Sequence, residues 1–441
     1  MRWNEAEYTG WGRVRRASGR RARPEKVTSL KAILKDAPSP AIGNLRSYGD
    51  QALNTGGGAI DMTRLDRLIA FDPETGVLAA EAGITIGEIV RVFAPRGWIP
   101  TVMPGTGFAT LGGAIANDVH GKNHHVSGSF GSHVLSIELV GASGRSRKLT
   151  RGGTPDLFRS TVGGMGQTGV ILSAAIQMQR CASEIMQVRE SRVEGLAEFL
   201  TLLDQSSADH VVGWIDATAT GAGLGRGILE QAEIKAGAEP IGKRRPKSVP
   251  VNAPRFLLSP PIVRLFNRFY LRRVPVAGRH IERRLEDFFF PLDRIHHWNR
   301  LYGKPGFHQF QCVLPEDTAP DTLVRMLTRI GDAGVASPLA VLKRLGEGQA
   351  GLMSFTMPGY TLAVDFPNRA GTAPLIAELE AMTESAGGRI YLAKDALMSA
   401  GSLGRMYPDL PDFQRIVQKA DPDGRFLTDM ARRLNLRGET T

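Results

Sequence analysis

The sequence predicts an α+β fold in two parts, and two observations support this prediction. Residues 41–183 combine short strand-like runs with many glycines, whereas residues 184–388 alternate longer strand-like runs with helical patterns. Runs of both kinds within one chain indicate sheets packed against helices. At 441 residues, of which 42% are hydrophobic, the chain is long enough for more than one core. We therefore expect two domains.

Composition limits the classes of partner. The net charge of +11 favours an anionic partner, which includes nucleic acid, anionic lipid and phosphorylated small molecules. Cys181 and Cys312 provide neither a disulfide framework nor a CxxC metal pair. The first residues lack the apolar core of a signal peptide, and the uncharged span 160–179 contains four glycines and three glutamines, which disfavour a membrane helix. We expect a cytoplasmic protein, with peripheral contact to the inner face of the membrane left open.

The first part is expected to contain short strands and helices in alternation. Apolar periodicity predicts helices at 27–35 and 86–93 and strands at 59–62, 68–72, 77–82, 134–140 and 170–176. The strand at 170–176 directly follows a GxGxxG match at 164–169. A dinucleotide fingerprint requires a helix after its glycines, so we reject a nicotinamide site here.

A glycine-rich stretch at 104–133 organises this part. It contains seven glycines and four histidines. Glycine allows the backbone to approach a ligand closely, so this density indicates backbone lying against a flat, anionic cofactor. Interleaved apolar residues such as Leu111 and Ile115 distinguish the stretch from a solvated linker. Arg46 and Ser47, in a second loop with small residues, are candidates for binding a diphosphate.

The second part is expected to form a sheet with helices on one face. Strand-like runs occur at 211–216, 306–314 and 360–366, and helical patterns at 321–333 and 373–386. A short helix near the end of the chain is expected to pack back on the first domain. This second domain should face the substrate.

Residues 255–284 combine eight arginines with Phe, Leu and Tyr side chains. A basic amphipathic surface of this kind binds anionic lipid or covers an apolar substrate tail. A domain-packing helix with a solvated basic face explains the pattern equally well. The arginine-rich segment 10–26 is not followed by a nucleic-acid-binding module, so we expect no nucleic-acid partner.

Several motifs resemble those of the vanillyl-alcohol-oxidase flavoproteins, which have a PCMH-type FAD-binding domain. The most specific is HGKNHH at 120–125 followed by GSFG at 128–131, and shorter matches occur at 46–50, 104–106, 111–116 and 163–169. The resemblance extends over nearly the whole chain. Within the family, the motifs are most similar to those of oxidases acting on a polyprenyl-phosphate-linked ribose.

The resemblance implies a PCMH-type FAD domain built from residues 1–183 and 389–441, with the substrate domain 184–388 inserted between them. It also implies FAD bound without a covalent link, because Tyr48 stands where covalent relatives carry a histidine. The implied FAD-binding residues are Ala41, Ile42, Gly43, Asn44, Leu45, Arg46, Ser47, Tyr48, Gly49, Asp50, Gln51, Gly105, Thr110, Leu111, Gly112, Gly113, Asn117, Asp118, Val119, His120, Ile171 and Tyr391.

The catalytic candidates are Lys394, His120 and Tyr391. A lysine among other cations has a lowered pKa and can accept a proton, or, when charged, can stabilise an alkoxide. The alternatives are an exposed lysine after a strand and a histidine that makes structural hydrogen bonds. The substrate-side residues implied by the resemblance are Trp214, Gln309, Gln311, Lys343 and Lys394, and we expect no metal site.

The activity implied is oxidation of a secondary hydroxyl of the lipid-linked ribose to its 2-keto form. This would be the first half of an epimerisation that makes a cell-wall polysaccharide precursor, completed by a short-chain dehydrogenase/reductase partner. An aldonolactone or sugar-alcohol oxidase of the same flavin family, and a non-catalytic module that binds anionic lipid or RNA, are the alternatives. The chain departs from the motifs at four positions: Ala363 and Asn117 stand where cysteines occur, Thr361 replaces an asparagine, and Leu45 replaces a glycine.

Overall fold

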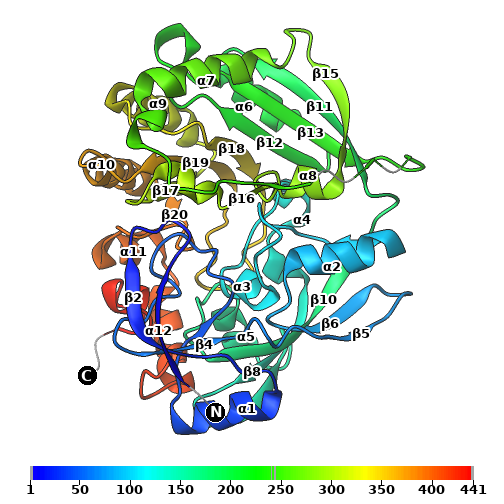
Figure 1. Ribbon diagram of the computed structural model, residues 1–441, viewed down its shortest axis with the longest axis vertical. Helices are drawn as coiled ribbons and strands as arrows, with labels where there is room; N and C mark the ends of the chain where they lie inside the picture. The colour runs from blue at the N-terminus through cyan, green and yellow to red at the C-terminus, as the bar shows by residue number, and fades with distance from the viewer. Residues whose placement is uncertain (1–2, 240, 243–244, 439–441) are drawn as a thin grey trace.

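A computed structural model describes residues 3–239, 241–242 and 245–438 of the chain. Figure 1 shows two stacked parts, with the eight-stranded sheet in one and the chain ends together in the other. Among the described residues, no helix combines the length and the apolar character needed to cross a bilayer.

Residues 3–183 contain two sheets and five α-helices. The four-stranded sheet has the order β1 (Asn4–Thr9), β2 (Arg16–Ala22), β4 (Gly58–Asp61) and β3 (Ala41–Ile42). The six-stranded sheet has the order β5 (Leu68–Phe71), β6 (Val77–Glu81), β10 (Val170–Arg180), β8 (Val134–Val140) and β9 (Ser146–Leu149), and β7 (Trp98–Pro100) pairs with the end of β10. The helices are α1 (Val27–Asp36), α2 (Ile86–Phe93), α3 (Leu111–Ala116), α4 (His124–Ser127) and α5 (Pro155–Thr161).

Strand β10 confirms the rejection of a dinucleotide fingerprint, because a strand and not a helix follows Gly169. Buried and partly exposed positions alternate along most of β10, as expected of a strand with one face on a core. Most of its buried residues pack with α2 and α3 in one hydrophobic cluster, whereas Val170 and Leu172 pack in another cluster with α1.

The glycine-rich stretch contains more regular structure than predicted. The short helices α3 and α4 lie within it, and Thr110 caps α3 by accepting a hydrogen bond from the Gly113 amide at 3.2 Å. Leu111, Ala114 and Ile115 of α3 are buried in the core. The stretch is therefore a set of loops supported by two short helices.

The inserted sheet has eight strands, paired antiparallel throughout. Its order is β15 (Arg279–Arg284), β11 (Ile185–Val193), β13 (Gly227–Ile234), β12 (His210–Ile215), β18 (Ala340–Leu345), β19 (Gly359–Pro367), β17 (Phe307–Leu314) and β20 (Arg389–Ile390). The helices of this part are α6 (Leu196–Asp204), α7 (Pro260–Arg272), α8 (Leu285–Phe289), α9 (Ala319–Ala333) and α10 (Thr372–Ser385), and a small parallel pair joins β14 (Lys247–Ser248) to β16 (Ile295–His296).

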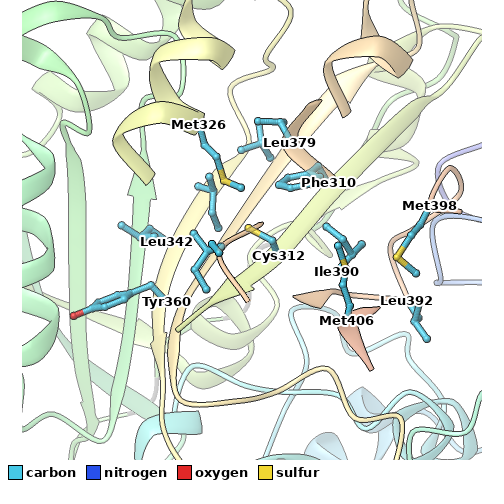
Figure 2. Packing of buried hydrophobic residues seen from close by; sticks show 14 of the residues in the cluster. Phe310, Cys312, Met326, Leu342, Tyr360, Leu379, Ile390, Leu392, Met398 and Met406 are labelled. Atoms are coloured by element: carbon cyan, nitrogen blue, oxygen red, sulfur yellow. The ribbon is translucent and has the colours of Figure 1, made fainter. Parts of the chain in front are cut away.

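The prediction of helices on only one face of this sheet is wrong. Helices α6, α9 and α10 pack on one face, where Figure 2 shows Met326 of α9 and Leu379 of α10 near Phe310 and Cys312 of the sheet. Helix α7 packs on the opposite face, because its Leu271 contacts Ile228, whereas the neighbouring Leu229 belongs to the first cluster. Helix α8 covers more of that opposite face. Side chains alternate along a strand, so one strand supplies two separate cores.

The two chain ends meet beneath the inserted part. Helices α11 (Ala400–Met406), α12 (Leu410–Ala420) and α13 (Asp429–Arg433) complete the chain. The Arg433 guanidinium contacts the Asp50 carboxylate at 2.7 Å, and Asp429 accepts a hydrogen bond from the Thr55 amide at 3.0 Å. We propose the predicted limits of 183 and 388 as the domain boundaries. Strand β20 begins directly after residue 388 and joins the edge of the inserted sheet by pairing with β17.

Candidate active site

A cavity of about 1320 Å³ lies between the first part and the face of the eight-stranded sheet that α7 and α8 partly cover. One wall comes from the loops around residues 41–52 and 103–122, and the other from strands β12, β17, β18 and β19. Both sets of predicted residues meet here. The lining includes Ala41, Ile42, Gly43, Asn44, Leu45, Arg46, Ser47, Tyr48, Gln51, Gly105, Thr110, Gly112, Gly113, Asn117, Val119, His120, Ile171, Trp214, Gln309, Gln311, Lys343, Tyr391 and Lys394.

Four predicted cofactor residues, Gly49, Asp50, Leu111 and Asp118, do not line the cavity. A Cβ at Gly49 would lie 1.7 Å from the Asp395 carbonyl oxygen, so only glycine fits there. Asp50 is ion-paired with α13, and Leu111 belongs to the core. The Asp118 carboxylate accepts a hydrogen bond from the Gly131 amide at 2.8 Å. These residues support the cofactor wall from behind.

The wall formed by the first part presents polar atoms that the protein leaves unpaired. Arg46 Nε, Gln51 Oε1 and Asn117 Oδ1 are buried without a hydrogen-bond partner. The Arg46 guanidinium lies between the rings of Trp11 and Phe108, 4.2 and 4.5 Å from their centres. Buried polar atoms normally have partners, so these atoms fit a ligand with anionic and hydrogen-bonding groups.

The glycines on this wall are consistent with FAD. Gly43 is packed so closely that a Cβ would lie 2.4 Å from the Thr110 hydroxyl oxygen, whereas a Cβ at Gly105 would meet no atom within 4 Å. The loops therefore pack tightly on one another and leave open space on the cavity side. Arg46 would supply a cation and donor for the diphosphate of FAD, and the unpaired oxygens of Gln51 and Asn117 would accept hydrogen bonds from the cofactor.

His120 connects the two walls of the cavity. Its Nε2 lies 3.0 Å from the Gln311 amide nitrogen, and its Nδ1 lies 3.3 Å from Lys343 Nζ. Burial, with the nearby Lys343 charge, holds the pKa of His120 well below its usual value, so the ring is neutral. Gln311 also donates to the Thr361 hydroxyl at 3.1 Å. One of the four departures from the family motifs, Thr361, therefore contacts a predicted substrate residue.

Lysines are gathered in the cavity. Burial lowers the pKa of Lys394 to about 8 and that of Lys343 to about 7. Lys394 Nζ lies 3.8 Å from the centre of the Tyr48 ring. The negative charge of Asp365 raises the pKa of Lys394 and so opposes the effect of burial. Part of each lysine population is therefore uncharged near neutral pH.

Tyr391 lies on the cofactor side of the cavity. Its hydroxyl donates to the Asn117 carbonyl at 3.2 Å, and its ring stacks on Phe355 with 4.6 Å between centres. Burial raises the pKa of Tyr391, so the hydroxyl keeps its proton. This geometry suits a residue that shapes the cofactor pocket better than one that accepts a proton.

The far end of the cavity is aromatic and strongly charged. The Trp214 indole donates to the Pro338 carbonyl at 2.8 Å, and its ring lies 4.7 Å from that of Tyr270 in α7. Arg273 and Arg279 contact the fully buried Glu190 carboxylate at 2.8 and 2.6 Å. These charge-assisted hydrogen bonds hold the side chains in fixed positions at the end of the cavity that faces α7.

Sequence reasoning missed two residues of the site. Lys122 lies two positions after His120 in the HGKNHH motif, lines the cavity, and has a pKa lowered by burial to about 8. Its place in the motif was a usable signal. Asp365 is fully buried behind Gln309, accepts hydrogen bonds from Gln309 and from the Tyr302 hydroxyl (3.0 Å for the latter), and has a pKa raised by burial to about 7. An isolated aspartate in a strand gives no such signal.

Two protein families and several known proteins are similar to this chain. The family described as FAD binding domain matches residues 20–150, and the family described as D-arabinono-1,4-lactone oxidase matches residues 363–434. The chain is 38% identical over 405 residues to decaprenylphosphoryl-beta-D-ribose oxidase of Mycolicibacterium smegmatis, covering 89% of this chain and 88% of the relative. An uncharacterised protein of Streptomyces coelicolor is 33% identical over 373 residues, covering 80% of this chain and 100% of the relative. L-gulono-1,4-lactone dehydrogenase of Mycobacterium tuberculosis is 22% identical over 424 residues, covering 93% and 95%.

These similarities agree with the cavity. The family match covers the loops with the unpaired polar atoms, and the similarity to the M. smegmatis oxidase extends over nearly the whole chain. The predicted family, the α+β fold and the use of FAD are confirmed. The chain belongs to the PCMH-type family of FAD-dependent oxidoreductases that includes decaprenylphosphoryl-beta-D-ribose oxidase.

Proposed function

We propose that the protein oxidises the 2-hydroxyl of a polyprenyl-phosphate-linked ribose to a ketone. The main support is one cluster in the cavity, where Lys394, Lys343, Gln309 and Gln311 face the wall assigned to FAD. Lysines and amides together bind an anionic, hydroxyl-rich molecule. The similarity to an oxidase whose name specifies decaprenylphosphoryl ribose supports the same substrate class.

In this proposal the side chains of the protein position the sugar and accept the proton of its reacting hydroxyl. Bound FAD would supply the hydride acceptor, held by the residues of the 41–51 loop, Asn117 and Tyr391, without a covalent bond. The neutral amine of Lys394 accepts the proton of the reacting hydroxyl, which its pKa of about 8 allows. Gln309 and Gln311 orient the other hydroxyls, and Lys343 holds His120 in place while facing the substrate anion.

The product and the position in the cell follow from the same proposal. A 2-keto sugar on a lipid carrier must be reduced to complete an epimerisation, so we propose a short-chain dehydrogenase/reductase as the partner. A lipid-linked substrate remains in the bilayer, so we propose a cytoplasmic enzyme with peripheral contact to the inner face of the membrane through residues 255–284.

An aldonolactone or sugar-alcohol oxidase is the second candidate. The observation in its favour is the match of residues 363–434 to the D-arabinono-1,4-lactone oxidase family. That segment contains Tyr391 and Lys394, which face the cofactor side, whereas Trp214 and Tyr270 lie on elements outside it. A small lactone would leave this aromatic end of the cavity unused.

The test is anaerobic reduction of the purified yellow protein by a short-chain polyprenyl-phosphoryl ribose, compared with L-gulono-1,4-lactone. Bleaching by the first substrate alone supports the proposal, and bleaching by the lactone alone favours the second candidate. Lys394→Met should retain the flavin spectrum and lose reduction by at least 100-fold, because general-base catalysis contributes roughly 100- to 10,000-fold. Lys148→Met, on the exposed edge strand β9, is the control. Normal reduction in Lys394→Met would remove this lysine from the mechanism.

A further inference from the structure

Helix α7 carries three parallel stripes of different character. Val263, Asn267 and Leu271 form its buried stripe. An exposed stripe of arginines lies beside the buried one, and an exposed apolar stripe follows beyond it, since residues three and four apart share a face of a helix. The exposed stripes are Arg264, Arg268 and Arg272, and then Ile262, Leu265, Phe266 and Phe269.

The apolar stripe is open to solvent. The exposed fractions are 55% for Leu265, 49% for Phe266 and 64% for Phe269. Phe256 before the helix and Val276 after it are also exposed, at 62% and 77%. Several large apolar side chains gathered on one exposed helix indicate a surface that is covered in use. Figure 1 places α7 at the outer end of the inserted domain, away from the chain ends.

A second cavity, of about 660 Å³, lies against the arginine stripe. Five arginines line it: Arg192, Arg226, Arg264, Arg268 and Arg272, together with Thr218 and Thr220. Arg226 is neutralised by Asp216 at 2.7 Å, and Arg192 by Glu194 at 2.7 Å. Within the part of the chain that the structure describes, no carboxylate forms an ion pair with the other three arginines. The cavity therefore has an excess of positive charge.

We propose that α7 lies in the surface of an anionic bilayer, with its apolar stripe in the lipid and the phosphate of an anionic lipid in the five-arginine cavity. Arginine binds phosphate oxygens through paired N–H donors, and threonine hydroxyls add further donors. A basic helix with a separate apolar stripe has the composition of an interfacial helix. This inference deepens the membrane contact proposed above and gives it a ligand.

The same helix lies beside the substrate cavity. Its Tyr270 and the adjoining Arg273 line that cavity, whereas Arg264, Arg268 and Arg272 line the second one. A bilayer on the outer side of α7 would therefore lie next to the aromatic end of the active site. A lipid-linked sugar then reaches the cavity without its tail crossing water, a consequence that rests on the proposed function.

The test is flotation of the full chain with vesicles of phosphatidylglycerol and phosphatidylcholine, compared with phosphatidylcholine alone. We expect binding only to the anionic vesicles. The variant Arg264→Gln/Arg268→Gln/Arg272→Gln should weaken partitioning on the order of 100-fold, since each basic residue near an anionic surface contributes about a factor of five. The variant Leu265→Ser/Phe266→Ser/Phe269→Ser should weaken it at least tenfold, because its apolar area no longer enters the lipid.

A charge-matched control separates a site from general electrostatics. Arg145→Gln/Arg147→Gln/Lys148→Gln removes the same three charges around strand β9 of the first domain and should bind like the wild type. Equal loss in this control, or unchanged binding in the α7 arginine variant, overturns the proposal. Unchanged vesicle binding by the apolar variant would show that the apolar stripe does not enter the lipid, and this also overturns the proposal. Wild-type vesicle binding abolished by millimolar inorganic phosphate would indicate a site for free phosphate and overturns the proposal as well.

The flavin spectrum shows whether a variant is folded, and its bleaching by substrate tests the proposed activity. Both readouts are independent of vesicle binding, which tests this inference. The α7 variants should retain bound flavin, and short-chain substrate should reduce it normally, because the replaced residues do not line the substrate cavity. Vesicle binding without any reduction by the lipid-linked ribose would refute the proposed substrate alone.

Discussion

Replacing Asp365 with asparagine should shift the pH at which Lys394 becomes active. Asp365 is fully buried in β19 opposite Gln309, and the Tyr302 hydroxyl donates to it at 3.0 Å. Its negative charge raises the pKa of Lys394, which burial otherwise lowers. Asparagine keeps the size and the hydrogen bonds, provided that the Gln309 amide turns over, and removes the charge.

The size of the shift follows from Coulomb's law. For an assumed separation of roughly 10 Å, two opposite charges interact by about 1.7 kcal/mol at an effective dielectric constant of about 20. This corresponds to about one pKa unit. The pKa of Lys394, about 8 in the wild type, should therefore fall toward ~7 in Asp365→Asn.

The measurement is the rate of anaerobic flavin reduction between pH 6 and 10 (roughly the range that brackets the Lys394 pKa). In the wild type the rate should rise with pH and level off above about 8, and in Asp365→Asn the same rise should occur about one unit lower. Asp421→Asn replaces a different buried carboxylate, which is ion-paired with Arg437 near the chain end, and should leave the profile in place. A rise that does not move in Asp365→Asn, with the flavin spectrum intact, would refute the assignment of Lys394 as the base.

Stability gives an independent check on Asp365. The folded protein keeps the Asp365 proton until pH about 7, whereas the unfolded chain releases it near pH ~4. The folded state binds the extra proton between these values, so this group's contribution to stability is present below pH ~4 and is lost as pH rises to about 7. The loss amounts to about 4 kcal/mol and should be absent in Asp365→Asn, as measured by urea unfolding across this range.

Two further predictions concern the support behind the cofactor wall. Gly49→Ala places a methyl group 1.7 Å from the Asp395 carbonyl oxygen, so it should lower the free energy of unfolding by about 3 kcal/mol and weaken FAD retention, whereas Gly404→Ala, with open space around it, should do neither. Arg433→Gln removes the cation that contacts both buried carboxylates, Asp50 and Asp395, and leaves Asp50 only the more distant Arg15 at 3.8 Å, so it should cost about 3–5 kcal/mol in urea unfolding at pH 7. Arg415→Gln, which breaks an exposed pair, should change stability by less than about 0.5 kcal/mol; equal losses in the two arginine variants would contradict the role of the buried pair.

Local patterns predicted most of the elements. The strands at 134–140 and 170–176 and the helices at 86–93 and 321–333 follow from the spacing of apolar residues, and the structure contains an element of the same type at each place. The short helices α3 and α4 were missed because glycines and histidines have weak helical preference, which in α3 the Thr110 cap and burial of Leu111 override. The prediction of helices on one face failed because α7 and α8 cover the other face, and sequence spacing does not reveal which face of a sheet a connecting segment crosses.

Some residues of the cavity could be predicted from sequence motifs, and others could be found only in the folded structure. The glycine loops and the lysine after β20 belong to motifs that are contiguous in sequence, so the resemblance to the flavoprotein family was sufficient to predict that they form one site. Lys122 and Asp365 have altered pKa values because they are buried, and burial arises only in the folded chain. Their charged neighbours, Glu230 for Lys122 and Lys394 for Asp365, belong to other segments that the fold brings beside them. No local pattern contains that information.

The sequence alone determined the α+β class, the family, the use of FAD and the basic character of residues 255–284. Composition, periodicity and contiguous motifs are properties of short stretches of chain, so they can be recognised without the fold. Only the tertiary structure decided which predicted residues line the cavity, that Gly49 and Asp50 support it from behind, and that the arginines of α7 meet Arg192 and Arg226 around a second cavity. These relations depend on side chains that are distant in sequence and close in space. Packing of the whole chain, and not any local preference, determines them.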